Sequence, residues 1–232
     1  MHYLVMEEWA RRDSPLHRRD ARVKMILLLV FLVWIGTARP AQPEAYAAYA
    51  SILLVAALAS RLPLLSLLWR AALVLPFAAT FALLSWMAGD AERAASLVLK
   101  SSFSAFAVLL VVATTPMPAL LAAVESLAAP KMLVMVVQFL YRYLFVLSEK
   151  AQHMWMAAQC RGGIRRASAG GAIAVLFASS HARAEGIHRA MLARGFAGHM
   201  PLIRPSSLHW LDISFLATGI LVLSLGRWLW IL

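Results

Sequence analysis

Apolar runs separated by short polar stretches dominate this chain, and they limit what it can fold into. Four of them cover about residues 25–35, 45–60, 64–88 and 94–113, and another covers about 208–225. Such runs suit helices that cross a bilayer, because only helices and closed barrels satisfy their own backbone in lipid. The sequence therefore predicts an all-α integral membrane protein with about five transmembrane helices.

The composition agrees with a membrane protein and excludes several other classes. Of the 232 residues, 62% are hydrophobic and 14% are charged, whereas soluble domains average roughly 45–50% apolar and 25% charged residues. Gly, Pro and Cys are too scarce for a collagen, a disordered chain or a disulfide scaffold. The single Cys160 has no partner for an intramolecular disulfide, and we interpret it as a packing residue.

The net charge of +11 is unevenly distributed along the chain. Residues 116–207 hold ten Lys or Arg against three Glu, and the first 24 residues are also polar and rich in Arg. The positive-inside rule places both basic regions in the cytoplasm. We therefore expect a cytoplasmic N-terminal segment (1–24), transmembrane helices 1–4 (25–113), a cytoplasmic module of amphipathic coupling helices (114–207) and a last transmembrane helix (208–232).

Individual charges and prolines near the spans carry further expectations. Arg22 and Lys24 should snorkel at the cytoplasmic end of the first span. Lys100 should snorkel toward the nearest loop, although a functional role is the alternative for a lysine inside a span. Pro76 should kink the third span, and Thr114-Thr115-Pro116 should end the fourth.

The predicted cytoplasmic module contains two helices. At about 100° per residue, polar side chains between Gln138 and Gln159 share one stripe, and apolar side chains lie opposite. This first helix should end at Gly162-Gly163, followed by Arg165-Arg166 as charges suited to a helix C-terminus. A second helix, from about Ile173, should end at Gly195. Each helix therefore closes on Arg-Gly.

The two helix ends share a pattern that suits recognition of a carboxylate. An arginine between a small residue and a cap glycine projects a planar, always charged fork with little steric hindrance. The helix dipole alone favours a cation at either end taken singly, but two such ends in one basic module favour a docking role. The two sequences are Ala158-Gln159-Cys160-Arg161-Gly162 and Met191-Leu192-Ala193-Arg194-Gly195.

With these motifs, the sequence resembles the transmembrane T component (EcfT) of energy-coupling-factor (ECF) transporters, of the CbiQ type. The resemblance covers nearly the whole chain. The two Ala-Arg-Gly motifs of that family correspond to Cys160-Arg161-Gly162 and Ala193-Arg194-Gly195, and Cys160 keeps a small side chain where the family has Ala. Other segments similar to the family, in the same order, are Ser14-Pro15-Leu16-His17 through Lys24, Thr114-Thr115-Pro116, Pro130, Tyr141-Arg142-Tyr143 and Glu149.

The resemblance implies a non-catalytic coupling subunit of an ATP-driven importer. Its partners would be two cytoplasmic ABC-type ATPase subunits, one membrane S component (CbiM-like) and the lipid bilayer, with no nucleic acid. Arg161 and Arg194 would each enter a groove of one ATPase subunit. An apolar face rich in methionine would form a platform for the S component, because methionine suits a surface that must slide and repack. The platform residues are Met132, Met135, Met154, Met156 and Met191.

The resemblance also implies where the cofactors and the protein are located. ATP and Mg would bind the ATPase and the transported metal would bind the S component, so no cofactor or metal is expected in this chain. The sequence agrees, since it has no Gly-x-x-x-x-Gly-Lys-Ser/Thr loop. The implied location is the cytoplasmic (inner) membrane of a prokaryote, multi-pass, with the N-terminus in the cytoplasm.

Three alternatives stay open. The transported substrate would be a cobalt or nickel ion, or instead biotin or another vitamin, because specificity belongs to the S component. His181, Glu185 and His188 share one helical face at metal-ligand spacing, as in a membrane metal-binding protein, although no fourth ligand is near in the sequence and a polar stripe facing water explains the same residues. Basic helices lying on anionic lipid would instead make the chain a membrane-surface structural protein.

Overall fold

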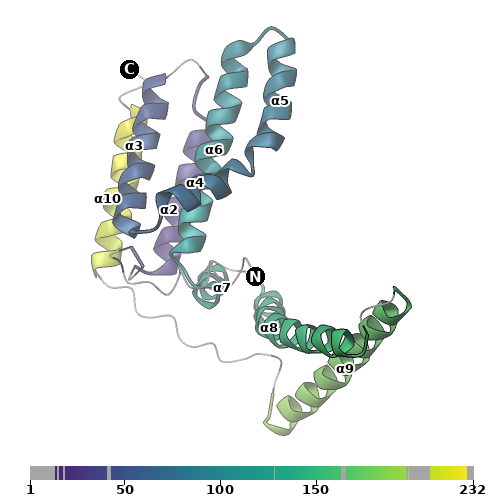
Figure 1. Ribbon diagram of the computed structural model, residues 1–232. Helices are drawn as coiled ribbons and strands as arrows, with labels where there is room; N and C mark the ends of the chain where they lie inside the picture. Colours follow the sequence, from purple (N-terminus) through teal and green to yellow (C-terminus); the bar gives the residue numbers. More distant parts are fainter. Residues whose placement is uncertain are drawn as a thin grey trace. The chain divides into compact units, whose positions relative to one another are not determined.

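The computed structural model describes residues 14, 16–17, 19–40, 43–127, 129–162, 166–196, 198 and 210–228. Every regular element within these residues is an α-helix (Figure 1), so the all-α prediction is confirmed. The chain divides into two compact units: the first contains residues 1–123 and 205–232, and the second contains residues 124–204. The helices are α2 (Ala21–Gly36), α3 (Pro43–Ser60), α4 (Leu64–Ala72), α5 (Leu75–Met87), α6 (Ala91–Ala113), α7 (Met117–Ser126), α8 (Lys131–Cys160), α9 (Arg166–Ala193) and α10 (Trp210–Trp228).

Two of the described helices, α6 and α8, are long and apolar enough to cross a membrane. The α4–α5 pair passes the same test as one bent span, and α3, α7 and α10 contain shorter apolar helices. Helices of this length and composition are those of a membrane protein. The expected number of about five spans stays a prediction. Because α8 belongs to the segment predicted to be cytoplasmic, its fitness for the bilayer is unexpected, and the location of that segment also stays a prediction.

Helix α6 is the centre of the first unit. It packs against α2, α3, α4 and α5, and α10 packs against α2 and α3. The rings of Phe31 and Tyr49 meet edge to face at a centroid distance of 5.8 Å, a favourable geometry for aromatic pairs. Two buried apolar clusters join these helices: Leu16, Ala57, Leu62, Leu67, Leu110 and Ala113 form one, and Phe31, Ile35, Ala45, Tyr49, Leu53, Ala107 and Leu223 form the other.

The third apolar run is broken into two helices. Helix α4 ends at Ala72, α5 begins at Leu75, and the two axes are bent by 51°. Pro76 lies in the first turn of α5, where its missing N–H costs no helical hydrogen bond. The predicted kink at Pro76 is therefore confirmed. The outward side chains of Trp69 and Phe77 are exposed, as expected of a face that meets lipid.

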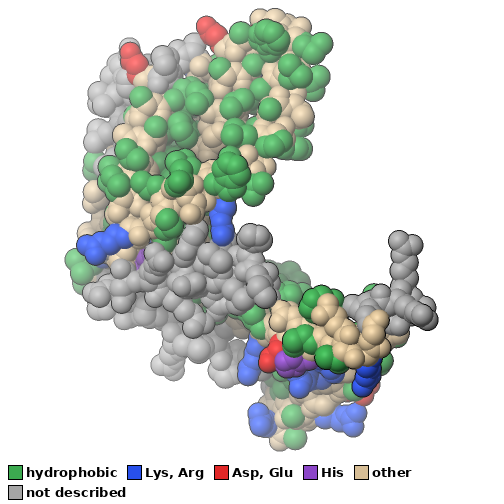
Figure 2. Space-filling view, in the orientation of Figure 1, with side chains coloured by type: hydrophobic (Ala, Val, Ile, Leu, Met, Phe, Trp, Pro, Cys, Tyr) green, Lys and Arg blue, Asp and Glu red, His purple; other side chains and the backbone are tan. Residues whose placement is uncertain are grey.

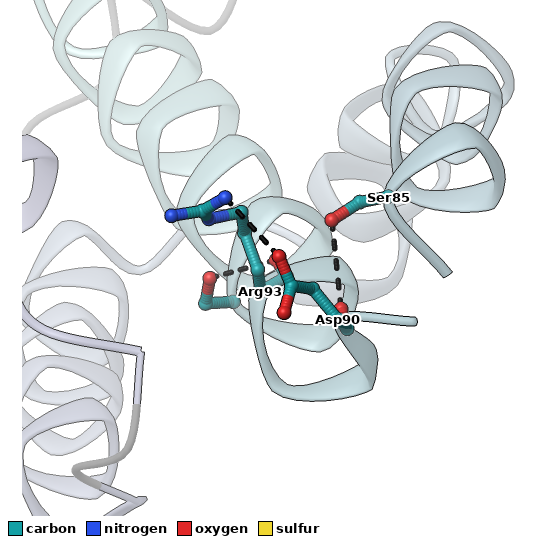
Figure 3. A network of polar contacts seen from close by, with 4 residues as sticks. Ser85, Asp90 and Arg93 are labelled. Atoms are coloured by element: carbon teal, nitrogen blue, oxygen red, sulfur yellow. Dashed lines mark hydrogen bonds and ion pairs between the residues drawn. The ribbon is translucent and has the colours of Figure 1, made fainter. Parts of the chain in front are cut away.

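A compact polar turn connects α5 to α6 (Figure 3). The hydroxyl of Ser85 donates to the backbone carbonyl of Asp90 at 3.5 Å. The backbone N–H of Asp90 in turn donates to the carbonyl of Ser85 at 3.1 Å. The guanidinium of Arg93 pairs with the Asp90 carboxylate at 3.2 Å. Both side chains of this ion pair are exposed, so it contributes little to stability. The predicted short loop at residues 89–93 thus becomes a turn followed directly by the first turn of α6.

The N-terminus of α2 differs from the expectation. Asp20 caps the helix, and its carboxylate accepts a hydrogen bond from the backbone N–H of Arg22 at 2.9 Å. The helix therefore includes Lys24, whose side chain is only 4% exposed, so the predicted snorkelling is wrong for Lys24. Ser14 and Leu16, expected in water, are also buried. Residues 1–13 lie outside the described part of the chain.

The second unit consists mainly of α8 and α9, which contact each other. Helix α9 begins at Arg166, not near Ile173, so Arg166 is the first residue of α9 and not a charge that follows α8. Small residues, including Gly170 and Gly171, fill the first turns of α9; they give a weak helix signal in sequence, yet helix interiors tolerate them. Figure 2 shows Lys and Arg side chains gathered over this unit.

Candidate functional site

The C-terminus of α8 ends as the sequence predicts. The backbone N–H of Arg161 donates to the carbonyl of Ala158 at 3.2 Å, and that of Gly162 donates to Gln159 at 3.2 Å. Gly162 has a φ of 101°, in the left-handed region that favours glycine. The glycine therefore turns the chain away from the helix axis directly after Arg161.

The C-terminus of α9 repeats this geometry. Gly195 has a φ of 77°, and its N–H donates to the carbonyl of Leu192 at 3.0 Å. The N–H of Phe196 donates to the carbonyl of Met191 at 3.0 Å. These two bonds define a Schellman motif, with Arg194 as the last residue before the left-handed glycine. Both predicted Arg-Gly helix ends are thus confirmed as structures, whereas their docking role stays a prediction.

The residues of both helix ends are exposed. Within the described part of the chain, neither the guanidinium of Arg161 nor that of Arg194 has an ion pair or a hydrogen bond. Arg189, one turn before Arg194, instead pairs with Glu185 at 3.0 Å. The exposed residues are Cys160, Arg161, Gly162, Ala193, Arg194 and Gly195. Cys160 is therefore not a packing residue of the described chain, contrary to our interpretation.

The five methionines predicted to form a platform differ in exposure. Met132 is 71% exposed and Met156 is 49% exposed, whereas the other three are half-buried. Several other large apolar side chains of the same two helices, not named among the predicted platform residues, are more exposed than Met156. They are Leu133, Val136, Leu140, Trp155, Ile173, Val175, Phe177 and Leu192. Helices α8 and α9 therefore present a wider apolar surface than methionine alone would make.

On α9, the carboxylate of Glu185 lies between His181 and Arg189 along one face of the helix. His181 Nε2 lies 3.4 Å from a Glu185 oxygen, and Arg189 pairs with the other oxygen of the same carboxylate. Among the described residues, no three His, Cys, Asp or Glu side chains come close enough together to hold a metal ion. The spacing of His181, Glu185 and His188 therefore does not correspond to a three-ligand group.

A buried polar cluster at one end of the first unit was not predicted. Lys24 Nζ donates to the carbonyl of Thr114 at 3.0 Å and to Thr115 Oγ1 at 3.2 Å. The guanidinium of Arg19 pairs with Asp212 at 3.6 Å and lies 5.5 Å from the centre of the Phe215 ring. The sequence feature that could have indicated this cluster is the high density of charged residues next to Asp20, which caps α2.

Lys100 also has a different environment from the one predicted. Its Nζ donates to the carbonyls of Gly36 and Ala38, at 3.1 and 2.6 Å, where α2 ends. The last carbonyls of a helix have no partner within that helix, and a lysine near them is favourable. Lys100 thus joins α6 to the C-terminus of α2 instead of snorkelling toward its own loop.

The apolar helices of the two units are those of an all-α membrane protein. Residues 12–203 match the model of the CbiQ family, described as cobalt transport protein. The chain belongs to this family, the T components of ECF transporters, and the resemblance is confirmed. An uncharacterized protein of Methanocaldococcus jannaschii is 26% identical, over 96% of this chain and 85% of the relative.

Proposed function

We propose that this chain is the coupling subunit of an ATP-driven ECF importer and that its two Arg-Gly helix ends dock two ATPase subunits. The observation that carries the proposal is the repeated geometry of α8 and α9. Each ends on an exposed arginine, followed by a glycine at positive φ that turns the chain away. Neither guanidinium has a partner among the described residues.

Charge-assisted hydrogen bonds explain why arginine would be placed there. A guanidinium offers several donors in a fixed plane, which matches a carboxylate with defined direction. The glycine caps leave the last helical turn unobstructed, so each arginine can enter a groove of a partner. Two such contacts would hold the two ATPase subunits at fixed points, and their movement would then change the angle between α8 and α9.

The apolar surface of α8 and α9 would have a role separate from that of the arginines. The exposed apolar side chains of α8 and α9, Met132 and Met156 among them, would contact a membrane S component that binds the transported ion. ATP and Mg would be bound by the ATPase subunits, so this chain would be non-catalytic. The chain would cross the inner membrane of a prokaryote, with its N-terminus and its Arg-Gly ends in the cytoplasm.

Coexpression with the ATPase subunits and the S component tests the proposal. Arg161→Ala with Arg194→Ala should abolish copurification of the ATPase subunits, because both charge-assisted contacts are lost. Each single variant should weaken assembly less, since two sites share the load. Lys150→Ala with Arg183→Ala is the matched control, because it removes two exposed charges from the same two helices. Full assembly and transport by the Arg161/Arg194 double variant would contradict the proposal.

Uptake assays with the same complex in vesicles identify the substrate class. We expect ATP-dependent uptake of cobalt or nickel ions and none of biotin. Uptake of a vitamin without metal uptake would leave the coupling role intact and assign a different S component, whereas ATP hydrolysis by the purified chain alone would contradict a non-catalytic role.

A further inference from the structure

Lys24 holds the end of α6, from which the chain passes to the second unit. Its ammonium group donates to the carbonyl of Thr114 and to the hydroxyl of Thr115. Thr114 is the C-cap of α6 and is completely buried. Helix α7 follows at Met117, begins in the first unit and ends in the second. Lys24 therefore contacts the end of α6, directly before the helix that leads into the second unit.

Arg19 contacts the start of α10, the first described helix after the chain returns to the first unit. Its guanidinium pairs with Asp212 and lies over the ring of Phe215, both in the first turns of α10. Asp212 is 7% exposed, so this ion pair is shielded from water more than a surface pair is. Arg19 and Lys24 flank Asp20, the residue that caps α2. One short segment at the start of α2 thus contacts both the end of α6 and the start of α10.

A partly open cavity of about 320 Å³, lined almost entirely by apolar side chains from α2, α3, α6 and α10, lies beside Lys24 and Thr114. Apolar contacts have no directional preference, so we expect the polar contacts of Lys24 and Arg19 to set where the ends of α6 and α10 lie. The carbonyl of Thr114, at the end of a helix, has no partner within that helix and depends on the lysine.

We propose that Lys24 and Arg19 are positioning residues for transport. They would hold the end of α6 and the start of α10 to α2, so that movement at the Arg-Gly ends, passed along the chain, reaches the membrane helices instead of being absorbed at these two helix ends. This inference rests on the proposed coupling function. A buried ammonium group requires its acceptors, and its contacts therefore give a defined position to the start of α7.

The chain contains a matched control for Lys24. Lys100 also makes two hydrogen bonds between α2 and α6, but at the opposite end of α2, at Gly36 and Ala38. Removing either lysine breaks the same number of contacts between the same two helices. Of the two lysines, only Lys24 contacts the residues that lead from α6 into α7 and so toward the second unit.

The test compares Lys24→Met with Lys100→Met in the complete transporter in vesicles, with ion uptake and ATP hydrolysis measured together. Lys24→Met should retain the ATPase subunits and hydrolyse ATP, but ions imported per ATP should fall by about fivefold or more, a typical coupling effect between sites. Lys100→Met should leave this ratio unchanged, and Lys24→Arg, which keeps charge and donors beside the cavity, should recover much of it.

An unchanged ratio for Lys24→Met, or an equal fall for Lys24→Met and Lys100→Met, would overturn the inference. If Lys24→Met does not assemble, Thr115→Val decides, because it removes only one acceptor: a lower ratio supports the inference and an unchanged one overturns it. Failure of the proposed function is distinguishable, since it appears in the Arg161→Ala, Arg194→Ala variant as retained ATPase subunits.

Discussion

Two lysines join α2 and α6 at opposite ends, and each donates to carbonyls where a helix ends. Lys24 reaches the end of α6 and Lys100 reaches the end of α2. Sequence reasoning predicted snorkelling for both, because a lysine near the end of an apolar run has the lipid headgroups as its nearest polar surroundings. The true acceptors lie 90 and 62 residues away along the chain. Only tertiary structure brings them within reach.

Lys100 should contribute to stability at the residue scale. Lys100→Met removes two hydrogen bonds from a charged donor and should lower the free energy of unfolding by about 2 kcal/mol. Thermal unfolding of the detergent-solubilised protein measures the change. Lys131→Met, at an exposed position on α8, should behave like the native chain. Equal melting temperatures for the Lys100 and Lys131 variants would contradict the assigned contact.

Helix ends are the elements that local sequence predicted best. The Gly162 and Gly195 caps, the break near Pro76 and the end of α6 before Pro116 all depend on backbone properties of glycine or proline, which act within a few residues. The start of α9 was placed too late because Ser168, Gly170 and Gly171 are weak helix formers and no large apolar residue between Arg166 and Ile173 shows a helical period. The start of α2 was also placed too late, since its Asp20 cap lies among charges assigned to a solvated segment.

The cap of α9 should set both local stability and ATPase binding. Gly195→Val places a β-branched side chain at a φ of 77°, which should destabilise the native turn by about 1–2 kcal/mol and redirect Arg194. Copurification of the ATPase subunits should fall, whereas Gly195→Asn should retain most of it, because asparagine tolerates the left-handed region. If the Val and Asn variants bind equally, the glycine does not position the arginine.

At the scale of the whole molecule, the composition predicted a membrane protein. The distribution of Lys and Arg along the sequence predicted that most of the basic charge belongs to the segment that forms the second unit. The apolar runs predicted α3 and α6 closely, because each run contains no Pro or Gly and is bounded by polar or proline residues. The burial of Leu16 and Lys24 could not be predicted, since the positive-inside rule assigns charged segments to a compartment and not to neighbours within the fold. The docking role of the helix ends depends on partners outside the chain and stays a proposal.

Cys160 allows the most direct measurement of that role. It is the single cysteine of the sequence, it is exposed, and it precedes Arg161. A thiol-reactive photocrosslinker attached to Cys160 in the assembled transporter should become covalently linked to an ATPase subunit. The control carries Cys160→Ala with Ser51→Cys, an exposed position on α3, and should yield no ATPase product. Crosslinking from Cys160 to lipid or the S component, with no ATPase product, would contradict docking at the Arg-Gly ends.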